Sequence, residues 1–373
     1  MMLNREVRLL LLCARIHIDS EQHILIRQMA ADNVDWWKLH SLGVEHRVVP
    51  LVYSILSRAC PDLVPDDVLG QFKHDVQWIV RHNLLVMQQL VRITSLLEAN
   101  GITSIPYKGP VLASTVYHNV GLRQFGDLDI LIHKQDFARA KQLLQAEDYE
   151  PSAQIVSGSD NIHVNQHHDY QFVHATMPLV IELQWGVMHV PLVFPSNLAD
   201  WWKNTEKIRL SGQEITTLLP EHLFLLLCVH GAKHVWSRLQ WICDIAEFIR
   251  AYPALDWDEV VRLAQHNYAE RILFLGLLVA QSLLDAPIPE YIKYRAEQNR
   301  IAVTLAEEVR QHYFMLANPA EHNHDATPLF YLRMMDRFND RLRFCVYCYP
   351  SLLKPSRIFR RYQLQPVRHL LGL

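Results

Sequence analysis

The chain has 373 residues, half of them apolar and a fifth charged, so a sizeable core is available and global disorder is excluded. The length suggests about two to three domains, and the scarcity of glycine, at 12 residues, favours a helix-rich protein. The 36 Lys and Arg against 39 Asp and Glu give a formal net charge of −3, and we expect no general nucleic-acid binding.

The first residues do not have the pattern of a signal peptide, because Arg5, Glu6 and Arg8 interrupt the apolar run. No stretch reaches 18 uncharged apolar residues, so we expect no membrane span and a cytoplasmic location. Most of the six cysteines lie in apolar stretches, which indicates a reducing compartment. Cys345 and Cys348 form a CxxC without a second pair, and a zinc or redox role is the weaker interpretation.

Three regions follow one another along the chain. Residues 1–98 predict a helical N-terminal region that ends in the amphipathic stretch Val76–Leu97, with Asn100-Gly101 as a helix C-cap. Residues 99–215 predict a small α+β core with a mixed sheet, and residues 216–373 a helical C-terminal region. The expected core strands are Ile102–Tyr107, Asp127–Ile132, Tyr170–Val173 and Val180–Trp185, and the expected core helices are Pro110–Tyr117 and Asp136–Glu147.

The C-terminal region is predicted to hold five helices. They cover residues 221–250, Trp257–Asn267, Arg271–Leu284, Pro289–Leu316 and Leu329–Cys348. The tail from Ser351 to Leu373 carries only basic charges: Lys354, Arg357, Arg360, Arg361 and Arg368. We expect this tail to fold back on acidic helices of the chain, with docking on an anionic surface as the alternative.

The strongest chemical signal is the pair Asp127 and Asp129, which point to the same face of a strand because side chains alternate. Two carboxylates that close repel each other unless a cation lies between them, and Mg²⁺ prefers carboxylate oxygens. Two such ions can hold the attacking and leaving oxygens in phosphoryl transfer. A pair of solvated carboxylates at a strand end is the alternative.

Two further signals lie on either side of this pair. Lys108-Gly109 joins a strand to a helix, where a free helix N-terminus and a lysine suit a phosphate chain. Taken alone, the motif is more often an ordinary tight turn. Glu182 lies inside an apolar strand, where an unpaired carboxylate is costly to bury. It either faces water or completes an acidic triad with the two aspartates.

Together, Lys108-Gly109, Asp127-Leu-Asp129 and Glu182 resemble the DNA polymerase β-type nucleotidyltransferase superfamily. The chain is more closely similar to a bacterial family of uncharacterised nucleotidyltransferases. The hallmarks of this family match Tyr117, Gly121-Leu-Arg123 and Trp185, and its second motif matches residues 230–244.

The resemblance implies a nucleotidyltransferase core flanked by the two helical regions. Asp127, Asp129 and Glu182 would be both catalytic residues and metal ligands for Mg²⁺, with Mn²⁺ as a substitute. A nucleoside triphosphate would be the substrate, and its nucleotidyl group would pass to an unknown small-molecule, peptide or protein acceptor with release of pyrophosphate. The expected nucleotide-binding residues are Lys108, Gly109, Arg123, His230, His234 and Arg238.

A single helix over 221–250 would place His230, His234, Arg238 and Asp244 on one stripe, at about 100° per residue. Such a stripe is either a wall of the active site, with Lys233 beside it, or an internal network such as an Asp244–Arg238 pair. Arg123 likewise pairs either with phosphate or with a nearby acid. A zinc hydrolase built on His230 and His234 is a weaker hypothesis, because no Glu follows His230 as in HExxH.

Two alternatives remain beside the enzyme. The second hypothesis is a non-catalytic scaffold of the same fold that binds a nucleotide or a partner, with the carboxylates serving only structure. Four histidines between the aspartates and Glu182 are either solvent-exposed or part of a flexible metal-binding loop: His163, His167, His168 and His174.

Overall fold

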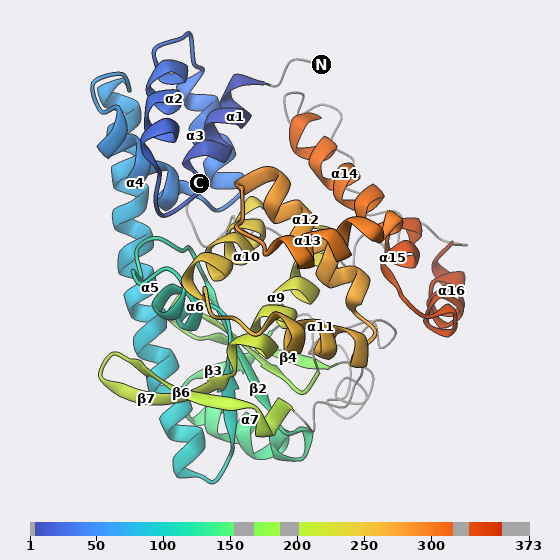
Figure 1. Ribbon diagram of the computed structural model, residues 1–373. Coiled ribbons are helices and arrows are strands. Elements are labelled where there is room, and N and C mark those ends of the chain that lie inside the picture. The colour runs from blue at the N-terminus through green and yellow to red at the C-terminus, as the bar shows by residue number, and fades with distance from the viewer. Residues whose placement is uncertain (1–3, 153–167, 187–200, 316–327, 353–373) are drawn as a thin grey trace.

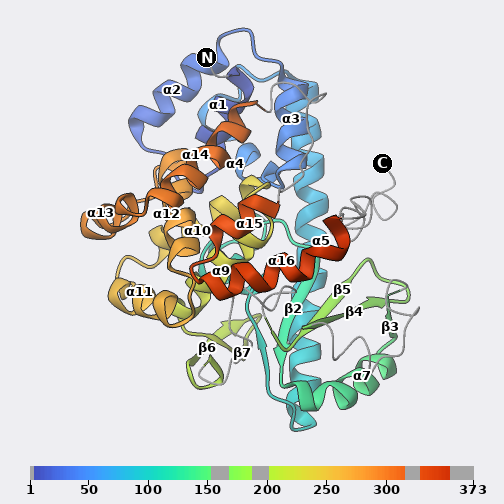
Figure 2. The same cartoon turned by 90° about the vertical axis from the view of Figure 1, so that its right-hand side faces the viewer.

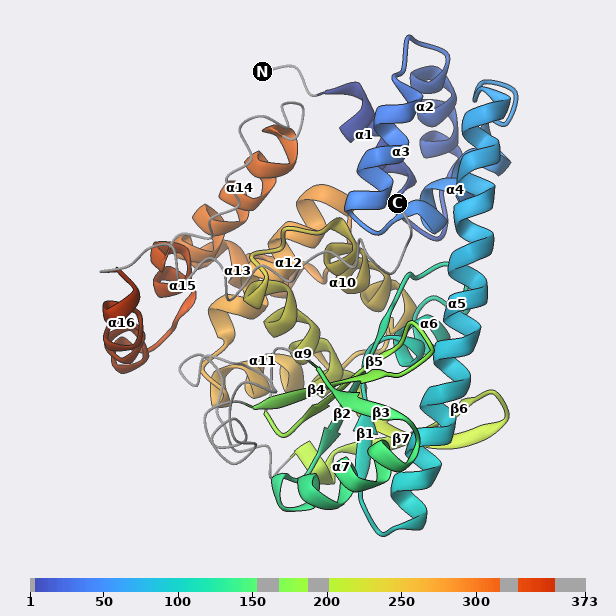
Figure 3. The same cartoon turned by 180° about the vertical axis from the view of Figure 1, so that it is seen from behind.

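A 34-residue helix, α5 (Asp66–Ala99), connects the N-terminal helices to the sheet. The computed structural model describes residues 4–152, 168–186, 201–315 and 328–352. The helices before α5 are α1 (Arg5–Cys13), α2 (Ser20–Ala30), α3 (Trp36–Glu45) and α4 (Val49–Ala59). In Figure 3, α5 runs from these helices at one end of the molecule to the sheet at the other, so the N-terminal region is fixed to the core by a continuous rod.

The expected α+β core is present as a five-stranded mixed sheet in the order β1-β2-β5-β4-β3. The strand β2 runs parallel to β5, and all other neighbours are antiparallel. The strands are β1 (Ser104–Pro106), β2 (Asp127–Ile132), β3 (Tyr149–Pro151), β4 (Asp169–His174) and β5 (Val180–Gln184). The helices α6 (Pro110–Thr115) and α7 (Phe137–Ala146) connect them, with short 3₁₀ turns at Lys134–Asp136 and Trp201–Lys203.

A separate hairpin follows the sheet. It consists of β6 (Thr205–Leu210) and β7 (Gln213–Leu218), joined by Ser211 and Gly212, both with positive φ. Two successive positive φ angles are typical of the type I′ turn that closes two-residue hairpins. This hairpin and the short strand β3 were not among the sequence predictions, and β7 extends past the expected core boundary at residue 215.

The C-terminal region is helical, as predicted, and packs between the N-terminal helices and the sheet (Figure 1). Its helices are α9 (Pro220–Lys233), α10 (Leu239–Ala251), α11 (Trp257–His266), α12 (Glu270–Leu284), α13 (Glu290–Gln298), α14 (Arg300–Met315), α15 (Pro328–Met334) and α16 (Phe338–Leu352). Figure 2 shows α14, α15 and α16 along one side of the molecule.

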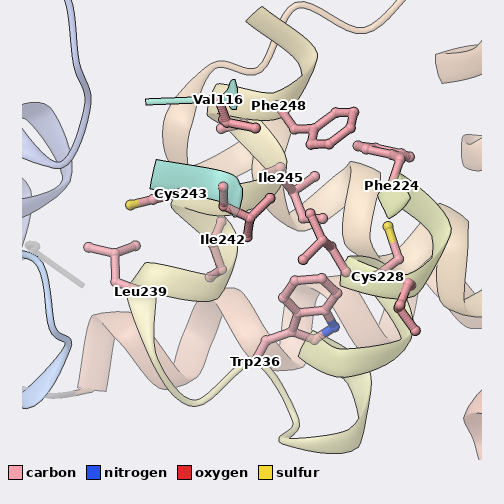
Figure 4. Packing of buried hydrophobic residues seen from close by; sticks show 14 of the residues in the cluster. Val116, Phe224, Cys228, Trp236, Leu239, Ile242, Cys243, Ile245 and Phe248 are labelled. Carbon is pink, nitrogen blue, oxygen red and sulfur yellow. The ribbon is translucent and has the colours of Figure 1, made fainter. Parts of the chain in front are cut away.

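The prediction of one helix over residues 221–250 is wrong. The helix α9 ends at Lys233, and Val235 and Trp236 adopt left-handed backbone angles of 55° and 54° before α10 begins at Leu239. Trp236 is fully buried and takes the space beside Gly231, where a Cβ would lie 2.3 Å from its ring. Figure 4 shows Trp236 below Ile242 and Cys228. Burial of this large ring therefore fixes the turn and redirects the chain.

The core contains four of the cysteines as free, buried thiols: Cys13, Cys60, Cys228 and Cys243. This confirms that they act as small apolar side chains. Cys345 is exposed on α16, and the side chain of Cys348 lies outside the described residues. None of the helices in the described ranges combines the length and apolar character needed to cross a membrane. The basic tail lies outside the described residues.

Candidate functional site

The turn between β1 and α6 brings Lys108 and Gly109 against the start of β2. Gly109 has a φ of 52°, and a Cβ at this position would lie 3.3 Å from the carbonyl oxygen of Asp127. Glycine is therefore required both by its backbone angle and by the close approach. Pro110 is the first residue of α6, as predicted, where its missing N–H is tolerated. The Lys-Gly turn and the aspartate strand are consequently neighbours in space.

The register of β2 and β5 places the three carboxylates on one face of the sheet. Asp127 lies opposite Val180, and Asp129 lies opposite Glu182. Directly paired residues of neighbouring strands face the same way, and residues two apart on one strand share a face. The structure thus brings together the three acids that the sequence singled out, although 55 positions separate Asp127 from Glu182.

Gln184 connects two of these carboxylates. Its Nε2 donates to Oδ1 of Asp129 and to Oε2 of Glu182, each at 3.0 Å, so these two oxygens are at most 6.0 Å apart. The Oε1 of Gln184 accepts a hydrogen bond of 2.5 Å from the hydroxyl of Tyr107. From β4, Gln171 donates to Oε1 of Glu182 at 2.5 Å. These neutral donors hold the carboxylates in fixed positions without neutralising them.

Lys108 supplies the positive charge closest to the acids. Its Nζ lies 2.7 Å from Oδ1 of Asp129 and 3.3 Å from Nδ1 of His230 on α9. Burial, together with the charges of Lys108, His234 and Lys233, holds the pKa of His230 well below its ordinary value. His230 is therefore neutral and accepts a hydrogen bond from the ammonium group, which fixes Lys108 between the helix and the sheet.

Burial and mutual repulsion both disfavour the charged forms of Asp129 and Glu182. Burial raises the pKa of Asp129, and Asp127 adds to this, although Lys108 opposes it. Burial also raises the pKa of Glu182 to about 7, with the charges of Asp129 and Asp127 contributing further. The charges of Lys108 and Lys233 lower the pKa of Asp129 without cancelling these effects, and a bound divalent cation would stabilise the charged carboxylates further.

Arg123 is paired with Asp244 on α10, although the charge of Asp127 also acts on it. Its Nε and Nη2 donate to the two carboxylate oxygens of Asp244 at 2.7 and 2.8 Å, and both side chains are buried. The hydroxyl of Tyr117 donates to the same carboxylate at 2.8 Å. Of the two interpretations of Arg123, the structure shows the pairing with an acid. It also shows that the internal network around Asp244 uses Arg123 and not Arg238.

The end of α9 and the turn to α10 bring Lys233 and Arg238 within reach of the charges of the acids. Burial lowers the pKa of Lys233, against the opposing charges of Glu182 and Asp169. Burial also lowers the pKa of Arg238 to about 10, and the charge of Asp127 opposes this. His234 is the C-cap of α9 and stacks on Trp241 at 4.7 Å between ring centroids. The single stripe predicted for these residues does not exist because the helix is broken.

Several residues of this site were not predicted as site residues from the sequence: Tyr107, Gln171 and Gln184, described above, and Arg47. Arg47 lies between α3 and α4 and is partly buried; burial lowers its pKa, and the charge of Asp127 acts against this. The sequence gives no signal for Arg47, because nothing in its neighbourhood shows that the N-terminal helices reach the aspartate strand.

The remaining histidines have structural contacts or lie outside the described residues. The Nδ1 of His174 accepts hydrogen bonds from the backbone N–H groups of Thr176 and Met177 in the turn after β4. His168 packs against Gly186, where a Cβ would lie 2.9 Å from its ring. His163 and His167 lie outside the described residues.

The donor set of the acidic face fits a hard divalent cation, since Asp127, Asp129 and Glu182 offer only carboxylate oxygens that repel one another. In the described part of the chain, no three His, Cys, Asp or Glu side chains are already arranged to hold a metal ion. The ammonium of Lys108 contacts Asp129 directly and so takes a position at this carboxylate that a metal ion would otherwise occupy. His230 and His234 likewise lack a third ligand among these residues, which gives the zinc hypothesis no support.

An α+β core that carries three carboxylates on adjacent strands, opposite a lysine-glycine turn, is the arrangement expected of a nucleotidyltransferase. The profile of the family described as "Uncharacterised nucleotidyltransferase" matches residues 32–285, well over half of the chain. The chain therefore belongs to this family. The match extends beyond the core into both helical regions, so Arg47 and the α9–α10 turn lie within it.

A search of curated proteins finds no match. Among solved structures, an antigenic nucleotidyltransferase-like protein from Paracoccidioides brasiliensis is similar, with 16% sequence identity and a TM-score of 0.32. The alignment covers 57% of this chain and 96% of that protein. A likeness of this size carries no argument about the function of this chain.

Proposed function

We propose that the protein is a Mg²⁺-dependent nucleotidyltransferase that moves a nucleotidyl group from a nucleoside triphosphate to a hydroxyl or phosphate acceptor and releases pyrophosphate. The observation that carries this proposal is the shared face of β2 and β5, on which Asp127, Asp129 and Glu182 lie in register. Membership of a nucleotidyltransferase family supports the same reaction class.

In this proposal Asp127, Asp129 and Glu182 would hold the divalent cations. When bound, Mg²⁺ supplies charge stabilisation for the phosphoryl oxygens and lowers the pKa of a coordinated hydroxyl. The raised pKa of Glu182, about 7, also suits this carboxylate to accept a proton from the acceptor hydroxyl. Gln184 keeps Glu182 and Asp129 together through its two hydrogen bonds.

Lys108 has two states in this proposal. Without substrate its ammonium pairs with Asp129 at 2.7 Å. With substrate we expect it to turn toward the phosphate chain, because a phosphate offers more negative charge than a carboxylate that a cation already neutralises. His230, held neutral, stays available to accept from the ammonium in either position.

The test is Mg²⁺-dependent release of pyrophosphate, or transfer of label from an α-labelled nucleoside triphosphate to an acceptor or to the protein. We expect loss of transfer in Asp129→Asn and Glu182→Gln. Glu150→Gln is the matched control, because Glu150 is an exposed carboxylate on β3 of the same sheet. Label transfer that persists in Asp129→Asn would overturn the assignment.

One observation favours a second function, a non-catalytic nucleotide-binding scaffold. The ammonium of Lys108 on Asp129 neutralises part of the acidic face without any metal, and the described residues hold no ready-made metal cluster. Calorimetry separates the two. A scaffold binds the nucleoside triphosphate without turnover over a broad set of acceptors, and its affinity is indifferent to Glu182→Gln.

A further inference from the structure

The charge of Asp127 acts on two partly buried arginines. They are Arg47, between α3 and α4, and Arg238, at the start of α10. Within the described residues, neither guanidinium is in an ion pair; Arg238 lies over the ring of Trp241 at 5.5 Å. By contrast, the buried Arg123 has a carboxylate partner in Asp244.

A group of hydrogen bonds centred on His46, called the His46 joint below, brings the backbone segments that carry these two arginines together. The backbone N–H of Gln240 donates to the carbonyl of His46 at 3.2 Å, and that of Leu239 donates to its Nδ1 at 3.3 Å. The Nε2 of Gln240 in turn donates to the carbonyl of Gln124 at 2.5 Å. The end of α3, the start of α10 and the loop before Asp127 therefore meet at one point. Residues 47 and 238 directly adjoin the bonded residues.

The backbone of Arg47 is unusual for an arginine. The helix α3 ends in a Schellman motif, in which the N–H of Val48 bonds to the carbonyl of Gly43 and that of Arg47 bonds to Val44. Arg47 takes the left-handed position of this motif, with a φ of 56°, which glycine occupies in most proteins. The chain therefore keeps a strained arginine where the backbone alone favours glycine.

The charge of Asp127 acts on both arginines, and that of Glu45 acts on Arg238 alone. The charge of Arg47 makes a positive charge on Arg238 less favourable, and the charge of Arg123 does the same for Arg47. Arginine stays protonated at neutral pH in proteins, and the lowered pKa of Arg238 is still about 10. Two partly buried cations that form no ion pair within the described residues favour the binding of an anion.

We propose that Arg47 and Arg238 form a phosphate-binding site beside Asp127, so that the N-terminal helices contribute to the active site. The proposal rests on the proposed function for its role in the reaction. Each guanidinium carries a planar fork of N–H groups that matches the oxygens of a phosphate. The phosphate belongs either to the triphosphate chain of the nucleotide or to a phosphorylated acceptor, and the experiment distinguishes these sources.

The test is calorimetry of the full chain with inorganic tripolyphosphate in the absence of divalent cations. We expect Arg47→Gln and Arg238→Gln each to weaken binding by about tenfold or more, as loss of a charge-assisted contact predicts. Arg8→Gln, on an exposed arginine of α1, is the control and leaves binding unchanged. Asp127→Asn removes the competing carboxylate and tightens binding. Unchanged affinity in both site variants would overturn the proposal.

A second measurement uses the unmodified protein and so does not depend on variants that fold. Tripolyphosphate is expected to protect Arg47 and Arg238, and not Arg8, from modification by phenylglyoxal, as read by peptide mass spectrometry. Equal modification of the three residues with and without tripolyphosphate contradicts the site.

Competition with ATP identifies the source of the phosphate. If the arginines hold the triphosphate chain, ATP displaces tripolyphosphate, and Arg47→Gln weakens the binding of ATP. If they hold a phosphorylated acceptor, inorganic phosphate binds to the ATP-loaded protein and Arg47→Gln weakens only that binding. Binding of tripolyphosphate without any nucleotidyl transfer would defeat the proposed function and leave the phosphate site standing, so the two failures are distinguishable.

Discussion

Replacing Asp244 by asparagine tests whether Arg123 has a structural role. The carboxylate of Asp244 accepts two hydrogen bonds from Arg123 and one from Tyr117, all between 2.7 and 2.8 Å. Asn83 holds the backbone of the same loop by donating to the carbonyls of Val120 and Arg123. The substitution keeps the size of the side chain but leaves a buried guanidinium without a counter-charge.

The expected cost is large because the pair is buried, with Arg123 and Asp244 exposed by only 6% and 2%. Removal of one partner of a buried ion pair costs about 3 to 5 kcal/mol. Replacement of both partners by apolar residues of similar volume is often neutral. The double variant Arg123→Met with Asp244→Leu should therefore lose less stability than Asp244→Asn alone.

The assay is urea denaturation followed by circular dichroism, which gives the free energy of unfolding for each variant. The control is Asp62→Asn, which breaks a bidentate pair of the same length with Arg27 at the surface. We expect this control to unfold nearly like the original chain, because solvent screens an exposed pair. If Asp244→Asn were as stable as the control, the structural role of Arg123 would be refuted and its guanidinium would be available to a phosphate.

Three other predictions follow from packing and charge. Gly231→Ala should lower the free energy of unfolding by about 1 to 3 kcal/mol in urea denaturation, because its Cβ would overlap the ring of Trp236. Gly70→Ala, with open space around the new Cβ, should raise it by about 0.5 to 1 kcal/mol. Equal effects of the two substitutions would contradict the packing. Glu182 has a pKa of about 7 in the folded chain, above its ordinary value, so the free energy of unfolding of the metal-free protein should fall by on the order of 1 to 3 kcal/mol as the pH rises from about 4.5 to 7. Glu182→Gln should flatten this pH dependence, and an unchanged slope in that variant would refute the prediction. Lys108→Met should raise the pKa of Glu182 further, because the ammonium of Lys108 lowers it in the original chain. The measurement is a titration of the Glu182 carboxyl by NMR, and a lower pKa in the variant would contradict the geometry.

Much of the core could be predicted because its signals are local. The alternation in β2 and β5 and the Pro after Gly109 depend on neighbouring residues, and the structure places these elements within a residue or two. The hairpin β6–β7 also had a local signal, since Ser211-Gly212 separates two alternating runs. Asn299, whose side chain accepts from the N–H of Ala302, similarly marks the break between α13 and α14, where a single helix was predicted.

The rest of the site depends on contacts between distant segments. Arg123 and Asp244 are 121 positions apart, and nothing in their spacing shows that they pair. The break after α9 contains neither glycine nor proline at residues 234–238, so it is burial of Trp236, and not local propensity, that ends the helix. Arg47 takes a left-handed position without glycine, so its place beside Asp127 is visible only once the N-terminal helices are packed.

The central claim is that the carboxylates of β2 and β5 together hold a divalent cation for a nucleoside triphosphate. The most direct measurement is the binding of Mn²⁺, as a paramagnetic substitute for Mg²⁺, followed by electron paramagnetic resonance with and without ATP. The claim predicts binding that strengthens with ATP and weakens at least tenfold in Asp129→Asn and in Glu182→Gln, but not in Glu150→Gln. Binding of equal strength in all four proteins would contradict it.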